Sequence, residues 1–176
     1  MQMRTTIRLI AFFCCFAGIL VLAETKTDYN HHADFTKYHS FSWIKAQTEN
    51  PLWTDRITTA INSELTGKGW SQAPSGGDVS IAAYGGTRTE QSLETWYSGF
   101  GGGWRWRGFG DGIATTTVEN IPVGTLQIDI FDSSTKELIW RGSATDTLSD
   151  KPEKNEKKLE KSIGDMFKKF PPESKG

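Results

Sequence analysis

The sequence predicts an α+β domain in which two amphipathic helices pack on one face of an antiparallel sheet of about four strands. Two segments carry apolar residues at helical spacing, and four shorter ones alternate apolar with polar residues as strands do. A helix with one apolar stripe must bury it, and a sheet with one apolar face is the available partner. The expected order is β-α-β-β-β-α, interrupted by a long loop rich in glycine and tryptophan.

The N-terminal segment 1–23 is predicted to be a cleaved signal peptide. Arg4 and Arg8 precede an uncharged apolar run at residues 9–22. A membrane span needs about 20 apolar residues, and this run is shorter. The small residue Ala23 precedes Glu24, so cleavage is expected between them, with an uncleaved anchor as the alternative. The signal predicts export to the periplasm or to the periplasmic face of an outer membrane.

Cys14 and Cys15, the only cysteines, lie in the middle of the apolar run. A lipid-modified bacterial cysteine follows a small-residue box at the end of such a run, so lipidation is disfavoured and membrane association is left open. After cleavage the mature chain would hold neither a thiol nor a disulfide.

Charge and length indicate one acidic domain. Removing Arg4 and Arg8 with the signal changes the net charge from −1 to −3. Nucleic acid is therefore not expected as a partner, because its binding normally demands a basic face. Residues 24–33 are predicted to be a polar leader, 34–172 a single domain and 173–176 a short tail.

The first strand and the first helix follow the leader. Residues 40–43 alternate serine with aromatic side chains, which predicts a strand ending near Trp43. The helix is predicted to begin at Asn50, which can cap it and which a proline follows, and to end at the glycines of 67–69. Its apolar stripe consists of Trp53, Ile57, Ala60, Ile61 and Leu65.

Alternation at Val79, Ile81 and Ala83 predicts the second strand. Residues 85–122 are predicted to form a long irregular excursion. The glycine-rich tract 99–112 within it has too much backbone freedom to propagate a helix or a plain strand.

Two strands and a helix complete the domain. Residues 126–130 alternate, and the turn 132–136 leads to a strand with Trp140; this short connection predicts an antiparallel hairpin. The last helix follows Pro152, with the stripe Leu159, Ile163, Met166, Phe167 and Phe170. The sheet face away from the helices is expected to be solvated or available to a partner, and carries Gln127, Asp129, Ile139 and Arg141.

Several strings resemble the bacterial family called domain of unknown function 4136. In the first half these are DFTKYHSFSW (residues 34–43), NPL (50–52) and LTGKG (65–69). In the second half they are GTLQIDIFD (124–132), LIWRG (138–142) and FPP (170–172). The resemblance implies an envelope protein of Gram-negative-type bacteria, often a lipoprotein, with a small α+β fold. It implies no catalytic residues, and this chain departs from the family in lacking a lipobox cysteine near the cleavage site.

The excursion supplies the candidate binding surface. Aromatic and arginine side chains interleave in it: Trp96, Tyr97, Phe100, Trp104, Arg105, Trp106, Arg107 and Phe109. Aromatic faces beside guanidinium groups can stack on sugars, on peptidoglycan or on aromatic side chains of another protein. The alternative is that these rings fold back over the open sheet face and form a small core of their own.

No cofactor, metal site or catalytic motif is predicted. The histidines gather with one aspartate but lack metal-ligand spacing: His31, His32, Asp34 and His39. The glycine tract lacks the lysine and hydroxyl residue of a phosphate loop. Asp129 is interpreted as a strand-face residue and Asp132 as a turn former, with Glu137 nearby, rather than as an acid–base pair. No nucleophile elbow supports hydrolysis.

These observations predict a non-enzymatic exported protein that acts through contacts with another envelope protein or with cell-wall glycan. The alternative is a carbohydrate- or peptidoglycan-binding module that uses the tryptophan-rich excursion. An envelope hydrolase would need carboxylates that converge near the excursion, which the sequence does not show. The oligomeric state is left open.

Overall fold

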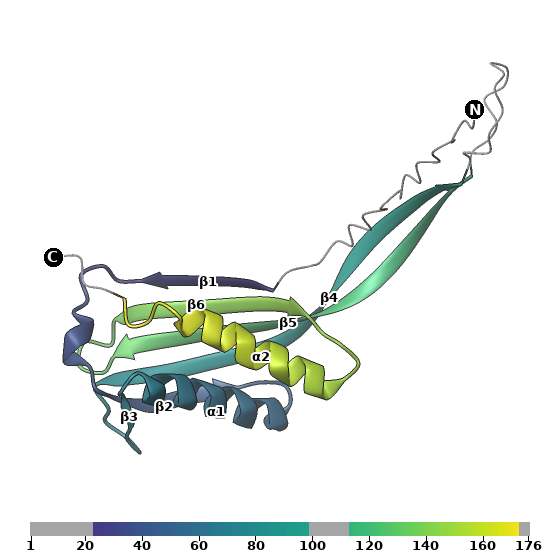
Figure 1. Cartoon of the computed structure of the whole chain (residues 1–176). Helices are drawn as coiled ribbons and strands as arrows, with labels where there is room; N and C mark the ends of the chain where they lie inside the picture. Colours follow the sequence, from purple (N-terminus) through teal and green to yellow (C-terminus); the bar gives the residue numbers. More distant parts are fainter. Residues whose placement is uncertain (1–22, 99–112, 173–176) are drawn as a thin grey trace, which may run out of the picture.

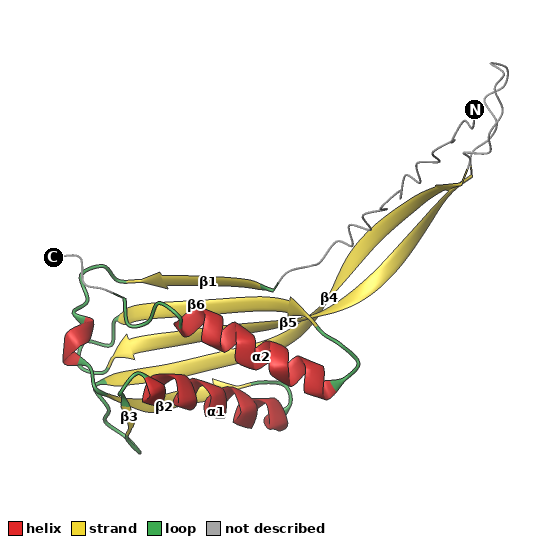
Figure 2. Ribbon diagram, viewed as in Figure 1, coloured by secondary structure: helices red, strands yellow, loops and turns green. Residues whose placement is uncertain are grey.

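The computed structural model describes residues 23–98 and 113–172, of which 92–98 and 113–117 are described by their backbone alone. The elements follow in the order β1 (Glu24–Tyr29), a 3-10 turn (Phe35–Lys37), β2 (Ser40–Gln47), α1 (Pro51–Gly67), β3 (Ser71–Gln72), β4 (Val79–Ser98), β5 (Ile113–Asp132), β6 (Leu138–Thr147) and α2 (Pro152–Phe167). Figure 1 shows the two helices side by side over the sheet, and Figure 2 shows the same layers by element type.

The strands of the described chain form one mixed sheet in the order β1-β6-β5-β4-β2-β3. Strand β2 runs parallel to β3 and β4, while the other pairs are antiparallel. The predicted α+β class is correct, but the antiparallel sheet of about four strands is wrong. Helix α1 lies between β2 and β4 and returns the chain to the same end of the sheet, so these neighbours run in the same direction.

The predicted polar leader includes an edge strand. Residues 24–29 pair antiparallel with β6, from Glu24 opposite Thr145 to Tyr29 opposite Trp140. An edge strand can be polar because one of its faces meets water, and charged side chains on it discourage pairing with other chains. Tyr29 alone in this strand packs against the core, so the strand lacks the apolar alternation by which sequence patterns are recognised.

The helices begin where the sequence predicts. The Asn50 side chain accepts a hydrogen bond from the Leu52 N–H at 3.0 Å, and proline occupies the first turn of both α1 and α2. From α1, Ile57, Ile61 and Leu65 are buried against the sheet. From α2, the side chains packed into the same core include Ile163, Met166 and Phe167, with Phe170 just beyond the helix.

The predicted irregular excursion is wrong in its outer parts. Strands β4 and β5 are each 20 residues long and pair without a register shift, from Val79 opposite Asp132 to Ser98 opposite Ile113. The residues on both sides of the glycine tract are mainly threonine and other strand formers, which outweigh Gly85 and Gly86. Within the predicted excursion, the glycine-rich tract 99–112 lies outside the described residues.

Simple alternation predicts that Ile139 lies on the sheet face away from the helices, and this prediction is wrong. The β5–β6 register shifts between Ile130 and Phe131, which pair with Trp140 and Leu138, and leave Ile139 as the extra residue of a β-bulge. The bulge turns Ile139 into the core, where it is 2% exposed.

Candidate functional site

The outer parts of β4 and β5 form the most unusual surface of the molecule. We call residues 88–98 and 113–122 the arm. Figure 1 shows the arm projecting away from the helix-covered sheet, with neither helix beside it. Strand β2 accompanies β4 no further than Tyr84, and β6 accompanies β5 no further than Val123. Within the described residues, both edges of the arm are therefore free of a neighbouring strand.

The described side chains of the arm bury little. Residues 88–91 and 118–120 are exposed, including the apolar Val118 at 52%. The sequence-predicted Trp96 and Tyr97 lie on β4 within the arm, and their backbones pair with Thr115 and Ala114. Six further predicted residues lie outside the described chain: Phe100, Trp104, Arg105, Trp106, Arg107 and Phe109. The arm thus joins the aromatic segment to the body by a two-stranded ladder.

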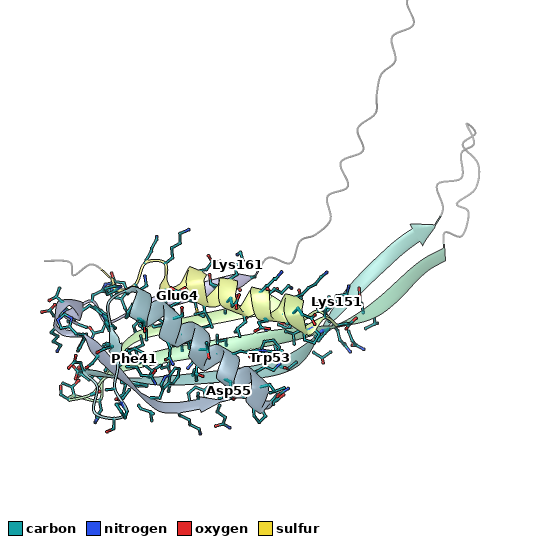
Figure 3. The ribbon with its side chains drawn as sticks, turned by 60° about the horizontal axis from the view of Figure 1, so that its bottom comes forward. Phe41, Trp53, Asp55, Glu64, Lys151 and Lys161 are labelled. Atoms are coloured by element: carbon teal, nitrogen blue, oxygen red, sulfur yellow. The ribbon has the colours of Figure 1, made fainter. Side chains whose placement is uncertain are left out.

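A pocket of about 290 Å³ lies where the arm leaves the body. Its apolar walls come from α1, the sheet and α2, with Trp53, Ile57, Leu126, Ala144, Leu148 and Leu159. Figure 3 shows Trp53 of α1 and Lys151, which precedes α2, toward the end of the body nearest the arm. The pocket therefore lies beneath the N-terminal halves of both helices. We call it the arm-base pocket.

Three glycines, Gly85, Gly86 and Gly124, line the pocket on its sheet side. A Cβ atom on Gly85 would lie 3.0 Å from Thr48 Cγ2, and one on Gly124 would lie 2.9 Å from Leu148 Cδ2. A glycine inside a strand commonly marks a place where another group approaches the backbone closely. No local sequence pattern indicates this pocket, because its lining comes from segments far apart in the chain, from Thr48 to Ser162.

The opposite end of the sheet holds a buried carboxylate. Asp132, 4% exposed, accepts hydrogen bonds from Ser134 and Thr135 of its own turn and from the Tyr38 hydroxyl at 2.7 Å. Lys37 Nζ lies 3.1 Å from the same carboxylate. The hydrogen bonds from Ser134 and Thr135, followed by that from Tyr38, hold the pKa of Asp132 far below its usual range. Asp132 is therefore a structural anion, as the turn interpretation predicts.

Asp129 has a different partner on the sheet face away from the helices. Arg141 donates Nε–H and Nη2–H to its two oxygens at 2.6 and 2.8 Å, and Gln127 donates to it at 2.9 Å. The Asp129 hydrogen bond raises the pKa of Arg141. Asp129 is 4% exposed, so this part of the face is less solvated than predicted. Asp129 and Asp132 are thus bound to different partners and form no acid–base pair.

The four residues of the histidine cluster also have separate contacts. The His31 ring meets the Tyr29 ring edge-on at 4.4 Å, and Asp34 caps the 3-10 turn through the Thr36 N–H. His32 and His39 donate backbone N–H groups to Asn30 and Asp78. In the described part of the chain, no three His, Cys, Asp or Glu side chains gather as metal ligands would.

Neither of the helices in residues 23–98 and 113–172 combines the length and hydropathy that a membrane crossing requires. Fold and surface together define a small α+β domain whose two helices cover one face of a mixed six-stranded sheet and whose central hairpin extends as an arm. The chain belongs to the family described as Domain of unknown function (DUF4136), whose model matches residues 25–172. This confirms the resemblance seen in the sequence strings.

Several solved structures are similar to this chain at low sequence identity. A PDZ domain protein from Parabacteroides distasonis is 16% identical with a TM-score of 0.58, and the match covers 86% of this chain. The match spans only 36% of that protein's length. The PelC dodecamer from Paraburkholderia phytofirmans is 13% identical with a TM-score of 0.47, and the match covers 82% of this chain and 95% of that one. A minor lipoprotein from Acinetobacter baumannii is 15% identical with a TM-score of 0.33, and the match covers 75% of this chain and 88% of that one. None of the curated proteins compared with the chain matches it in sequence.

Proposed function

We propose that this protein is an exported, non-enzymatic component of the bacterial cell envelope that binds another envelope protein through its arm. The observation that carries the proposal is the arm itself: a ladder that continues past the helix-covered body and whose described side chains are exposed apart from the half-buried Ile121. Ordering such a ladder costs conformational entropy, and the exposed side chains at 88–91 and 118–120 offset little of it by burial. A partner that covers the arm would offset that cost.

Two features of the sequence support a partner of this kind. The predicted signal peptide at 1–23 directs the chain to the envelope. Between the two strands of the arm, residues 99–112 carry tryptophan, phenylalanine and arginine, the types that are enriched at protein interfaces. Cell-wall glycan, which also stacks on aromatic faces, is the second candidate because the same residue types serve both.

Site-specific photocrosslinking in living cells tests the proposal. A photoreactive residue replaces Val118, 52% exposed on the arm, or Ile44, 63% exposed on β2 in the body, as the matched control. We expect position 118 to give one crosslinked product of defined mass containing an envelope protein, and position 44 to give none. If the crosslinked protein from position 118 is recovered only with the sacculi purified from those cells, the glycan would be favoured instead. Equal products from both positions, or none from position 118, would contradict the proposal.

A further inference from the structure

Several polar side chains in the lining of the arm-base pocket are already hydrogen-bonded within the protein. Lys158 Nζ donates to the Thr147 carbonyl at 2.7 Å and lies 3.1 Å from Asp146 Oδ1. The Asn155 amide both donates to and accepts from the Ser149 backbone, each at 2.7 Å. The Thr48 hydroxyl lies 2.9 Å from that of Thr54. Among the described side chains, no buried polar atom lacks a hydrogen-bond partner.

An occupant of this pocket would therefore be held by apolar contact. A ligand with many polar groups would lose hydrogen bonds to water, whereas the buried polar side-chain atoms of the described residues already have partners. The walls that remain are mainly aliphatic, from Ile57, Leu126, Leu148 and Leu159, with one aromatic ring from Trp53. Aliphatic walls with few free polar groups suit a hydrocarbon.

Size and position narrow the class of ligand. An apolar cavity of roughly 150 Å³ can hold benzene, and this pocket of about 290 Å³ accepts something longer than one ring. The pocket is half-open to solvent, so a polar end of the ligand can stay in water. Glu24 pairs with Thr145, between the pocket residues Ala144 and Asp146.

We propose that the arm-base pocket binds one unbranched acyl chain, from a membrane lipid or a free fatty acid. The chain lies between the N-terminal halves of α1 and α2, against the part of the sheet that contains Gly85 and Gly124. An ion pair between Arg56 and Glu156, 3.5 Å apart, links the two helices. This inference does not depend on which partner the arm binds.

Isothermal titration of the purified exported protein tests the proposal. The titrants are dodecanoate and dodecanoyl lysophosphatidylethanolamine, each kept below its micelle-forming concentration, with acetate as the head-group control. We expect saturable binding of one chain per protein molecule and none of acetate. Binding of the lysophospholipid assigns the chain to a membrane lipid, and binding of dodecanoate alone assigns it to a free fatty acid. The absence of saturable binding to both would overturn the proposal.

Variants then place the ligand. Ser162→Leu fills the pocket from α2, where Ser162 is buried, and should weaken binding about tenfold or more. Ser63→Leu makes the same change at an exposed position on α1 outside this pocket and should leave binding within about twofold. Ala144→Ile fills the pocket from β6 and serves if Ser162→Leu does not fold. Undiminished binding to a folded pocket-filling variant would also overturn the proposal.

Discussion

The Tyr38 hydroxyl donates a hydrogen bond to Asp132 Oδ2 at 2.7 Å and joins residues 94 positions apart in the sequence. Tyr38 follows the 3-10 turn and Asp132 ends β5, so the bond fixes the segment before β2 to the end of the central hairpin. Burial, and then the bond to Asp132, raise the pKa of the Tyr38 phenol. This cluster stabilises the end of the sheet remote from the arm.

Replacing Asp132 should lower stability in a pH-dependent way. In Asp132→Asn, the new amide N–H groups face the donors Lys37 and Tyr38, and the loss should be about 1–3 kcal/mol at neutral pH. The folded-state pKa of Asp132 lies below that of the unfolded chain, about 3.9. Its contribution is therefore complete above about pH 4 and is lost as the pH falls further. Denaturant unfolding at pH 7 and pH 3 measures both, and the wild-type advantage should shrink at pH 3. An equal difference at both pH values would refute the charge argument.

Gly77→Ala should destabilise the protein more than the same change at Gly67. A Cβ on Gly77 would lie 2.5 Å from Phe41 C and 2.8 Å from Ser42 N, which are backbone atoms that cannot turn aside. We expect a loss of about 2 kcal/mol or more. Nothing lies within 4 Å of a Cβ on Gly67 in α1, so Gly67→Ala should be neutral or gain up to about 1 kcal/mol. Thermal unfolding compares the two, and similar melting temperatures would show that the contact at Gly77 relaxes.

The pair Asp129 and Arg141 should show energetic coupling across β5 and β6. Two parallel N–H···O bonds join them, and Asp129 is nearly inaccessible to water. A double-mutant cycle with Asp129→Ala and Arg141→Ala should give a coupling free energy of about 0.5–3 kcal/mol. Because Arg141 remains exposed, a value near the lower end is expected in high salt. Additive single-mutant effects would indicate that the pair contributes no stability.

Processing should release a mature chain that starts at Glu24. Ala23 provides the small residue before the cut, and β1 begins directly at Glu24. N-terminal sequencing of the protein from the envelope fraction measures this. Detection of the intact N-terminus would instead support the uncleaved anchor.

The helices and the central hairpin turn were predictable because each has a local signal. Asn50 before Pro51 marks a helix start, and alternation over residues 126–130 marks a half-buried strand. The parallel β2–β4 pair was missed because direction depends on the α1 crossover rather than on either strand. Strand β1 was missed because its edge position permits a polar sequence. Gly85 and Gly86 concealed the continuation of β4, since glycine disfavours a strand unless its partner holds it in register.

The candidate site was only half predictable. The aromatic residues of the excursion stand out by composition, and Trp96 and Tyr97 do lie on the arm. The arm-base pocket arises where α1, α2 and the sheet meet, so no local pattern indicates it. The burial of Asp129 could not be predicted from local sequence either, because it depends on the contacts of Asp129 with Arg141 and Gln127.

Shortening the arm tests the central claim most directly. Residues 89–122 are replaced by Asn-Gly, which joins the directly paired Arg88 and Val123 through a two-residue hairpin turn. Affinity capture from crosslinked envelope fractions then compares this variant with the full chain, and circular dichroism checks the body. We predict a body that still folds cooperatively and a loss of the captured envelope protein. Capture of the same protein by the folded, shortened variant would contradict the account.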